Sequence, residues 1–570
     1  MDDDRPRLSR RSWIGRASSP ALAASLGAGL FQARNADAQA TDTPAAPDAG
    51  RDLGTRIYNV RDFGAKGDGT TLDTSALQSA IDACTRDGGG TVLVPAGVFH
   101  IGTVELKSNV TLHLAAQSKL LGSADGKQYH AADAIPLTGP HTIGDGNWAL
   151  IFAAEARNVT VEGRGTIDGQ GLQFRSPARG TPPPSGLGGS RRPHHLLFYK
   201  CDNLTIRDVD LRDCAYHSTR IVLCRHVYID GVHIHSRVNG NNDGFHFISA
   251  EHVTLSNCTV ECQDDACALF GSCKWMTITN SFFSTRWSVF RFGTGVAENI
   301  TVSNCLLNQV YGCPIKLRAD PGSRFENISF SNLVLQDVTG PIHIGSGPQP
   351  SRNNRPRPDR PPAVVRNISF SNIKGTVTTK PSKLPNTPFE MGVDNVAELH
   401  SCIVLNAVGD SVLENVSFDD VHLTFGGGGT AEEAARRDLP QHAGEYFQLG
   451  PMPAFGLYAR NARGLTLNNV RFQVSEPDLR PALIFDHVQG ASVRGLSVQG
   501  HKEAESVVRL IDTKDVLLSS THVLTPSAPF LQLEGPANEG ITVEGGDVSK
   551  AAAPVVFKNG ASENGVKVRV

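Results

Sequence analysis

Two short acidic segments carry the residue types that acid–base chemistry needs. Residues 241–244 read NNDG and residues 263–266 read QDDA. Asp243 and Asp264 are 21 residues apart, close to one repeat of the pattern described below, and residues one repeat apart in stacked strands lie about 4.8 Å from each other. Like charges that close raise at least one pKa, so one carboxyl group keeps its proton while another is ionised. Glycoside hydrolysis uses such a pair, and we take Asp243, Asp264 and Asp265 as the candidate catalytic residues.

Cations follow this acidic patch along the chain. Arg286 lies 22 residues beyond Asp264, Arg291 comes shortly after it, and Lys316 lies about one repeat further on. Cations in this register would orient an acidic sugar by binding its carboxylate. For any one of them a solvated ion pair is the alternative interpretation, but the set in register favours substrate binding.

Other polar residues near the same repeats give weaker signals. Four histidines fall there, namely His217, His233, His235 and His246. His233 and His235 would share a strand face, yet no third metal ligand is evident, so two surface histidines are the favoured interpretation. Trp287 could stack on a sugar ring or be a buried aromatic. The sequence therefore predicts neither a metal nor a cofactor.

A short pattern of alternating apolar and polar residues recurs through the chain. It begins at residues 158, 203, 226, 252, 275, 299 and 327, reading NVTVEGRGTIDG at the first and NITVSNCLLNQV at the sixth. The steps from 203 to 327 are 23, 26, 23, 24 and 28 residues. Alternation of this kind indicates strands with one buried face, and a step near 24 is too short for a propeller blade. It fits one coil of a parallel β-helix with about three short strands.

Three further features refine this all-β prediction. Ser-Asn pairs recur at one phase, with asparagines at 257, 280, 304, 332 and 372, and could form an Asn ladder, although asparagine also simply favours turns. Residues 71–84 have helical spacing and are expected to cap the first coil. Insertions at 175–193, 345–362 and 426–453, the last with a short helix near 431–437, are expected on the binding face; the first two could close one end of a groove and favour exo-action.

Composition excludes several protein classes. The chain has 570 residues, is 39% hydrophobic and has a net charge of -3, which argues against a nucleic-acid binder and against a disordered chain. It lacks an apolar run long enough to span a membrane. Nine of its eleven cysteines lie between Cys201 and Cys313, and we interpret most cysteines as small apolar core residues, although an oxidising compartment would permit disulfides.

The N-terminus is interpreted as an export signal. Arg10-Arg11 precedes a run of small residues and a small-x-small site at 36–38, which is typical of a twin-arginine signal over 1–40; a disordered basic tail is the alternative. Residues 41–56 are expected to be a linker and 57–570 a single domain, and the oligomeric state stays open. Export predicts a periplasmic or extracellular location.

The residues at 58–84, YNVRDFGAKGDGTTLDTSALQSAIDAC, and GTIDGQG at 165–171 resemble glycoside hydrolase family 28, the polygalacturonase family of the pectate-lyase-like β-helix superfamily. The resemblance covers roughly 57 to 340 and implies a right-handed parallel β-helix. It further implies that the chain hydrolyses a pectin-like polysaccharide, galacturonan or rhamnogalacturonan.

The catalytic signatures of that family carry over unevenly. Its N-T-D resembles residues 241–243 and its D-D resembles Asp264-Asp265, which implies an inverting reaction with Asp264 as general acid and Asp243 and Asp265 activating water. At its G-H-G this chain has STRW at 284–287, and at its R-I-K it has PIK at 314–316. The histidine of G-H-G and the arginine of R-I-K are therefore absent, while the lysine is kept. Arg286 and Arg291 are candidates to supply the missing positive charge. A lyase on the same fold, or a β-helix that only binds carbohydrate, are the alternatives.

Overall fold

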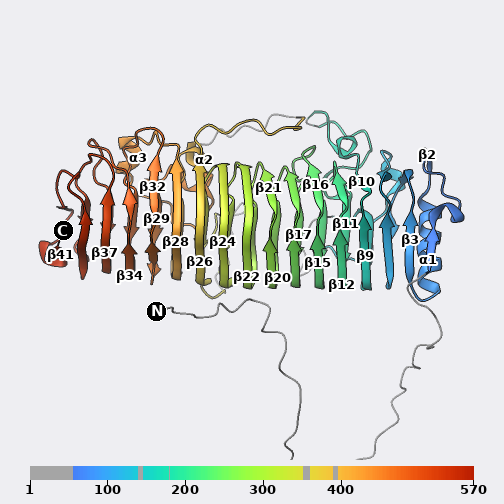
Figure 1. Cartoon of the computed structure of the whole chain (residues 1–570), viewed down its shortest axis with the longest axis horizontal. Helices are drawn as coiled ribbons and strands as arrows, with labels where there is room; N and C mark the ends of the chain where they lie inside the picture. Colours follow the sequence, from blue (N-terminus) through green and yellow to red (C-terminus); the bar gives the residue numbers. More distant parts are fainter. Residues whose placement is uncertain (1–55, 139–145, 179, 351–359, 389–395, 570) are drawn as a thin grey trace, which may run out of the picture. The chain divides into compact units, whose positions relative to one another are not determined.

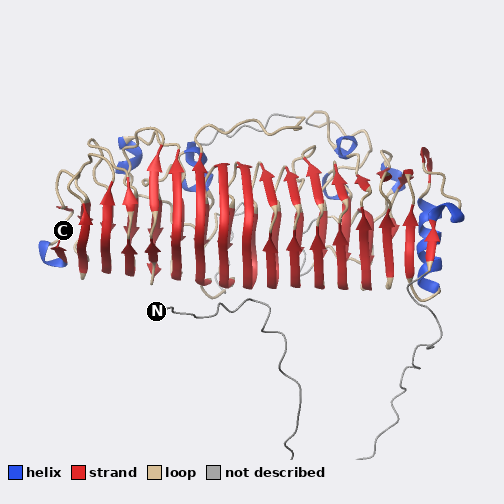
Figure 2. Cartoon of the chain, viewed as in Figure 1, coloured by secondary structure: helices blue, strands red, loops and turns tan. Residues whose placement is uncertain are grey.

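The computed structural model describes residues 56–138, 146–178, 180–350, 360–388 and 396–569. The predicted export signal lies outside these residues, as does the predicted linker apart from residue 56. Asp52–Val570 forms one compact unit. Strands make up most of it, and the helices are few, as Figure 2 shows. They are α1 (Thr74–Arg86), α2 (Val396–Leu399), α3 (Ala431–Ala435) and α4 (Tyr446–Leu449), with 3-10 turns at Val60–Phe63, Gly126–Gln128, Gly171–Phe174, Gly189–Arg191 and Glu563–Gly565.

The strands form three parallel series that run along the molecule (Figure 1). The first series, called the site sheet here, consists of β5 (Val104–Glu105), β8 (Ala149–Ala154), β11 (His194–Tyr199), β14 (Thr219–Val222), β17 (Phe245–Ile248), the start of β20 (Cys267–Thr279), the start of β22 (Phe290–Val310), β23 (Ile315–Ala319), β25 (Ile342–Ser346), β27 (Ile403–Ala407), β29 (Leu457–Arg460), β33 (Leu483–Asp486), β36 (Val508–Ile511), β38 (Leu531–Glu534) and β40 (Val555–Lys558).

The other two series share several long strands. The second consists of β1 (Ile57–Asn59), β3 (Gly90–Val94), β6 (Val110–Leu114), β9 (Arg157–Gly163), β12 (Asp202–Arg207), β15 (Arg225–Asp230), β18 (Glu251–Ser256), β20, β22, β24 (Arg324–Val338), β26 (Val364–Val377), β28 (Leu413–Phe425), β30 (Ala462–Arg463), β31 (Thr466–Asn468), β34 (Gln489–Arg494), β37 (Lys514–Val523), β39 (Ile541–Asp547) and β41 (Val566–Arg569). The third consists of β2 (Asp68–Leu72), β4 (Gly97–Ile101), β7 (Ser118–Gly122), β10 (Thr166–Asp168), β13 (Asp210–Arg212), β16 (His233–Ser236), β19 (Thr259–Cys262), β21 (Phe282–Thr285), later parts of β22, β24, β26 and β28, then β32 (Arg471–Val474), β35 (Ser497–Val498) and β37.

Each strand pairs in parallel with its counterpart one coil later, which is the connectivity of a parallel β-helix. Ile206 pairs with Ile229, Ile229 with Leu255, and Leu255 with Ile278, all of them buried. Alternate residues of each strand point inward, so every coil adds an apolar layer to one continuous core. An all-β chain built from repeated coils is therefore confirmed.

Asparagines in left-handed backbone conformation mark the coil corners. The predicted ladder forms over three coils, where Asn372 Nδ2 donates to Asn332 Oδ1 (2.9 Å) and Asn332 Nδ2 donates to Asn304 Oδ1 (3.0 Å). Asn257 departs from it, because its amide donates to Asp230 instead. A second ladder connects Asn299, Asn327, Asn367 and Asn415. Asparagine tolerates positive φ better than other side chains with a Cβ, which explains its recurrence at these positions.

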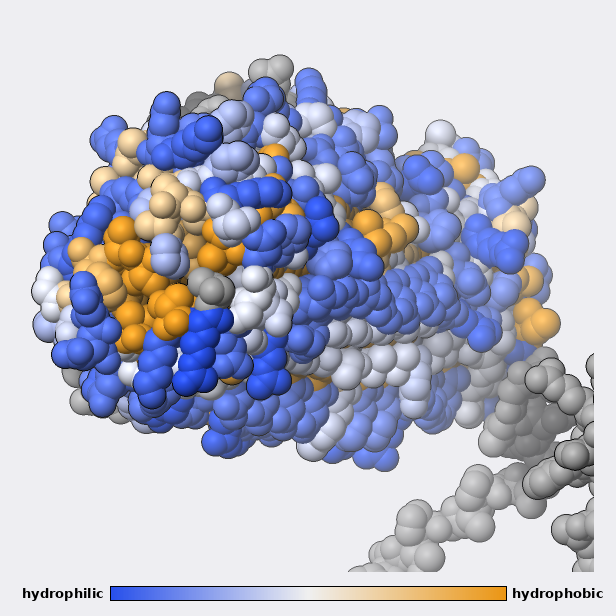
Figure 3. Space-filling view, turned by 60° about the vertical axis from the view of Figure 1, so that its left-hand side comes forward, coloured by the Kyte–Doolittle hydropathy of each residue, from blue (hydrophilic) through white to orange (hydrophobic). Residues whose placement is uncertain are grey.

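The two ends of the coil stack differ. At one end α1 packs on β1 and β3 and buries Leu77 and Ile81. At the other end Phe557 and Val566 are only partly buried and Val568 is exposed, and Figure 3 shows an apolar patch there. All eleven cysteines are buried free thiols, which confirms their interpretation as core residues. None of the described helices is long and apolar enough to cross a membrane.

The longest insertion packs against the outside of the site sheet. Leu439, Tyr446 and Leu449 contact Val404 and Tyr458 in a small apolar cluster separate from the core. The short helix α3 begins at Ala431, as the sequence predicts, but ends at Ala435. The insertion therefore covers the site sheet on the C-terminal side of Lys316. Of the insertion at 345–362, residues 351–359 lie outside the described residues.

Candidate active site

The three candidate catalytic aspartates lie in turns that lead into the site sheet. Asp243 precedes β17, and Asp264 and Asp265 precede β20. The turns stack on each other, since Gly244 N donates to Asp265 O (3.0 Å). One-coil stacking therefore gathers side chains that are 21 residues apart in the sequence, as predicted.

A buried asparagine fixes the turn that carries Asp243. Asn242 Oδ1 accepts hydrogen bonds from the backbone N–H groups of Val238 (2.9 Å) and Asn239 (2.6 Å). Its Nδ2 donates to the carbonyls of Cys214 and Tyr216, both at 2.8 Å. All four bonds are inside the protein, so this side chain holds the shape of the turn and leaves the neighbouring carboxylate to face the site.

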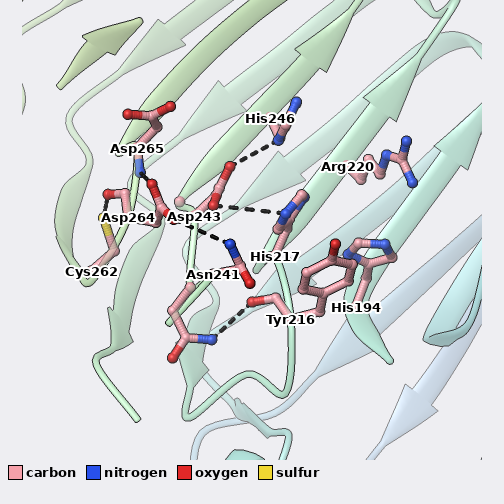
Figure 4. Close-up of polar contacts among 12 residues, drawn as sticks. His194, Tyr216, His217, Arg220, Asn241, Asp243, His246, Cys262, Asp264 and Asp265 are labelled. Carbon is pink, nitrogen blue, oxygen red and sulfur yellow. Dashed lines mark hydrogen bonds and ion pairs between the residues drawn. The ribbon is translucent and has the colours of Figure 1, made fainter. Parts of the chain in front are cut away.

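Two histidines hold the carboxylate of Asp243. His246 Nδ1 lies 2.9 Å from Asp243 Oδ2, and His217 Nε2 lies 3.7 Å from Asp243 Oδ1, as Figure 4 shows. The two imidazole rings stack at 4.7 Å. Burial, followed by the neighbouring His246 and His194, lowers the pKa of His217 well below its usual value. His217 is therefore neutral at ordinary pH and lies beside the carboxylate, 3.7 Å away, without adding a charge.

Asp264 is the aspartate most strongly disposed to hold a proton. Burial raises its pKa well above the usual value, and the charges of Asp243 and Asp265 raise it further. Its Oδ1 accepts from the backbone N–H of Asp265 (2.9 Å), and its Oδ2 accepts from Asn241 Nδ2 (3.4 Å). A protonated carboxyl group among ionised ones is the arrangement that a general acid requires.

Asp265 has a different environment from Asp264. Burial raises its pKa, while Arg291 and Lys316 oppose that effect. Its Oδ1 accepts from Ser288 N (3.3 Å), and its Oδ2 lies 4.0 Å from Arg291 Nε. Asp265 thus stands between the other two aspartates and the cations.

Two of the three predicted cations, Arg291 and Lys316, lie in one register row of the site sheet. His246 pairs with Ala268, Ala268 with Arg291, and Arg291 with Lys316. Lys316 Nζ donates to Glu445 Oε2 (2.9 Å), and Arg291 Nη2 lies 3.6 Å from Glu445 Oε1. The structure therefore brings these two cations together, and places on them a carboxylate from the insertion at 426–453.

Arg286 occupies a neighbouring position on the turn before the first residues of β22. Its Nη2 lies 3.8 Å from Glu398 Oε2, and its Nη1 donates to the carbonyl of Tyr311. Arg286 and Lys316 both contact the ring of Trp287, at 5.7 and 4.9 Å from its centroid. Trp287 is partly exposed, so it is not the buried aromatic that the sequence left as an alternative.

The family model for glycosyl hydrolases family 28 matches residues 84–386. The chain belongs to this family. Two solved family structures share its fold: the exopolygalacturonase of Thermotoga maritima (TM-score 0.54, 20% identity, 73% of this chain and 92% of that one) and the family 28 exopolygalacturonase of Yersinia enterocolitica (TM-score 0.56, 20% identity, 77% and 79%).

Curated relatives of this family 28 chain carry polygalacturonase names. The exo-poly-alpha-D-galacturonosidase of Dickeya chrysanthemi is 25% identical over 400 residues, which is 60% of this chain and 62% of the relative. A probable polygalacturonase of Vitis vinifera is 31% identical over 295 residues, 50% of this chain and 56% of the relative. The alignments thus span less than two thirds of either relative.

His233 and His235 lie away from this family 28 site, in line with their interpretation as surface histidines. His235 Nδ1 bonds to Glu261 (3.2 Å) and His233 is exposed on the third series of strands. Among the described residues it is His217, Asp243 and His246 whose ligand atoms lie within 4.8 Å of one another, a spacing that could hold a metal ion. The prediction that the site uses no metal stays a prediction.

Two insertions bring residues to the site that sequence reasoning missed. Arg192, from the insertion at 175–193, donates to Asn241 Oδ1 (2.9 Å) and lies 4.3 Å from the centroid of Tyr216. Glu445 arrives from 129 residues beyond Lys316. The repeat pattern could not predict the position of either residue, because an insertion does not pair in register with the neighbouring coils.

Proposed function

We propose that this chain hydrolyses glycosidic bonds in a pectin-type polysaccharide, galacturonan or rhamnogalacturonan, with inversion at the anomeric carbon. Membership of family 28 and the polygalacturonase names of its relatives support the class of reaction. The observation that carries the proposal for the site is the gathering of three carboxyl groups, of which Asp243 and Asp265 are buried and Asp264 has a pKa raised well above the usual value by desolvation and by its two neighbours.

In the proposed mechanism Asp264 donates its proton to the glycosidic oxygen as the bond to the anomeric carbon breaks. A water on the opposite face of the sugar attacks that carbon, and Asp243 and Asp265 orient it and accept its proton. The hydrogen bond to His246 keeps Asp243 in place, and His217 packs beside it. The atoms balance, since one proton enters the leaving group and one leaves the water.

The experiment is a polysaccharide panel of polygalacturonate, rhamnogalacturonan and neutral glycans, with wild type, Asp264→Asn and the remote control Asp62→Asn. New reducing ends without ultraviolet absorbance, lost only in Asp264→Asn, are expected. Reducing ends with the absorbance of unsaturated uronates would establish a lyase instead, and binding without cleavage would establish a carbohydrate-binding β-helix.

We further propose exo-action. The insertion carrying α3 and α4 packs on the site sheet beyond Lys316, and Arg192 lies over Tyr216 on the other side of the aspartates, so both flanks of the site are built up. One short product from the start of digestion is expected, whereas products of mixed length would contradict it.

The remaining proposals concern the chain as a whole. We propose a right-handed coil, a capping role for α1, a single catalytic domain over 57–570, and export directed by residues 1–40 with 41–56 as linker. Burial of Leu77 and Ile81 of α1 on the first coil supports the cap. An exported location agrees with a polysaccharide substrate, and fractionation of the full chain against an Arg10/Arg11→Lys variant would test it.

A further inference from the structure

Two neighbouring coils bring two imidazoles and one carboxylate together at the candidate active site. His217 lies shortly before β14, and Asp243 lies shortly before β17, which contains His246. β14 and β17 pair in parallel, and the backbone N–H of Ser218 donates to the carbonyl of Asp243 (2.9 Å), so the two turns stack. One nitrogen of each histidine and one carboxylate oxygen lie within 4.8 Å of one another, and Figure 4 shows both rings beside the carboxylate.

The spacing of these three groups matches the ligand spacing of a small divalent metal. Zn²⁺ binds imidazole nitrogen and carboxylate oxygen at about 2.0–2.2 Å, so the ligand atoms of a tetrahedral site lie about 3.3 Å apart. Asp243 Oδ2 lies 2.9 Å from His246 Nδ1, and Asp243 Oδ1 lies 3.7 Å from His217 Nε2. These two distances bracket the tetrahedral value, so small shifts of the side chains would complete three bonds to a metal.

His217 has bonding capacity that the protein does not use. The distance of 3.7 Å between its Nε2 and Asp243 Oδ1 is too long for a hydrogen bond. Its other nitrogen, Nδ1, is buried and has no hydrogen-bond partner among the described residues. With the proton of the neutral ring on Nδ1, Nε2 presents a lone pair to a carboxylate oxygen, which also carries lone pairs. A cation between the two atoms would accept electron pairs from both, which accounts for an arrangement that hydrogen bonds leave unsatisfied.

The three side chains are held in place without a ligand. The ring of His217 stacks on that of His246 at 4.7 Å and contacts the rings of His194 (5.0 Å) and Tyr216 (4.3 Å). The turn that carries Asp243 is fixed by the four hydrogen bonds of the asparagine before it. Groups that are already ordered lose little conformational freedom on binding, which favours affinity.

The ligand types select the class of metal. Imidazole suits Zn²⁺, Cu²⁺ and Ni²⁺, whereas Ca²⁺ and Mg²⁺ require oxygen ligands. We propose that His217, Asp243 and His246 bind a divalent transition metal of the Zn²⁺ class, which inhibits the enzyme by occupying the carboxylate of Asp243. The inhibition rests on the proposed function, in which this carboxylate accepts a proton from water, but the metal binding does not. The metal is thus an inhibitor and not a cofactor.

Metal binding is tested with Co²⁺, which absorbs visible light much more strongly in a four-coordinate protein site than in water. The full chain, freed of metal with EDTA, is titrated with Co²⁺ and, in a calorimeter, with Zn²⁺, and one ion per chain is expected. His217→Phe keeps a ring in the stack but removes a ligand, and should weaken binding by at least about 100-fold, which exceeds the usual cost of losing an outer partner. If this variant does not fold, His217→Gln replaces it.

The matched control is His113→Phe. His113 Nδ1 lies 3.0 Å from a carboxylate oxygen of Glu162, as His246 does from Asp243, but this pair belongs to no three-ligand group among the described residues. The control is expected to bind Co²⁺ and Zn²⁺ as wild type does. Absence of the Co²⁺ absorption in wild type, or an unchanged affinity in the folded His217 variant, would overturn the metal site.

Hydrolysis is measured on the same samples, each relative to its own metal-free rate. The EDTA-treated wild type is expected to be active, and Zn²⁺ should inhibit it at a concentration lower than that for His217→Phe by the factor found in binding. Bound Zn²⁺ without loss of hydrolysis, or activity that is lost with EDTA and restored by Zn²⁺, would overturn the inhibition. A metal-free protein that cleaves no polysaccharide would refute the proposed function, while the Co²⁺ spectrum would still decide the metal site.

Discussion

The acidic and cationic halves of the site satisfy their charges in opposite ways. Asp264 has no cation in direct contact among the described residues. Its pKa is raised mainly by burial and further by the neighbouring charges of Asp243 and Asp265. One register row away, Lys316 and Arg291 share the carboxylate of Glu445. The aspartates lie in turns that lead into the site sheet, and Arg291 and Lys316 lie on its next strands, so position in the fold alone does not account for the difference.

The difference indicates which half of the site lowers the stability of the folded protein in order to serve catalysis. A buried ion pair with three cations around one carboxylate is a stable arrangement that costs much to break. Crowded carboxyl groups, of which Asp265 alone lies near a cation, are costly to keep, and such groups are typical of catalytic sites. We therefore expect substitution of Asp264 to abolish activity and raise stability, and substitutions that break the ion pairs of Glu445 to lower stability.

Asp264→Asn gives the largest expected effect. Loss of the general acid should lower kcat by about 10²–10⁴-fold. Because the folded-state pKa is raised, the native protein holds this proton more tightly than the unfolded chain does, and wild type loses that stability as pH rises through the folded pKa. The variant should therefore gain stability over wild type from acid to neutral pH.

Denaturant titrations at several pH values, with Asp62→Asn as the matched exposed control, measure this trend. A stability difference that stays constant with pH would show that Asp264 is not the group with the raised pKa.

Breaking the cationic half should act on stability. Lys316→Met removes one hydrogen bond to the buried carboxylate of Glu445, which keeps Arg318 and Arg291 as partners, and we expect a cost of about 1.5–3 kcal/mol. The double variant Lys316→Met/Glu445→Gln should cost less than the sum of the two single variants, because each side chain needs the other. Additive losses in denaturant unfolding would show that the two groups are energetically independent.

His246 offers a way to sharpen the comparison within the acidic half. His246→Leu removes the bond to Asp243 (2.9 Å), and a mispositioned base should lower kcat by about 10²-fold with little change in KM. His246→Asn, whose amide can donate from nearly the same place, should recover part of it. Equal losses in both variants, or a matching fall in thermal stability, would point to a packing role.

Much of this architecture follows from the sequence, because residues that are one repeat apart in the chain lie next to each other in adjacent coils. The step of 21 residues from Asp243 to Asp264 placed the carboxyl groups together, and the alternating pattern gave the strands and the buried faces. The sequence did not show which histidines meet. Stacking between coils joins His217 to His246, whereas His233 and His235 share one strand away from the aspartates, as expected of surface histidines.

Charges delivered by insertions could not be predicted. Glu445 lies 129 residues from Lys316, and its position depends on how α4 packs on Val404 and Tyr458. Packing of an irregular segment against a sheet has no periodic signature in the chain. The repeat therefore gave the cations, and only the folded structure showed their partner.

Substitution of Glu398, the carboxylate that lies near Arg286, gives the smallest expected effect on stability. Unlike that of Glu445, the pKa of Glu398 is raised, because burial outweighs the opposing charges of Arg286 and Lys316, and its contact with Arg286 is 3.8 Å long. The folded protein thus binds this proton more tightly than the unfolded chain, and wild type loses that stability as pH rises. Glu398→Gln should therefore raise stability slightly at neutral pH, and the gain should vanish in acid. Unfolding of Glu398→Gln and Glu445→Gln in parallel decides the point, since a loss in the first as large as in the second would show that both carboxylates hold the cations equally.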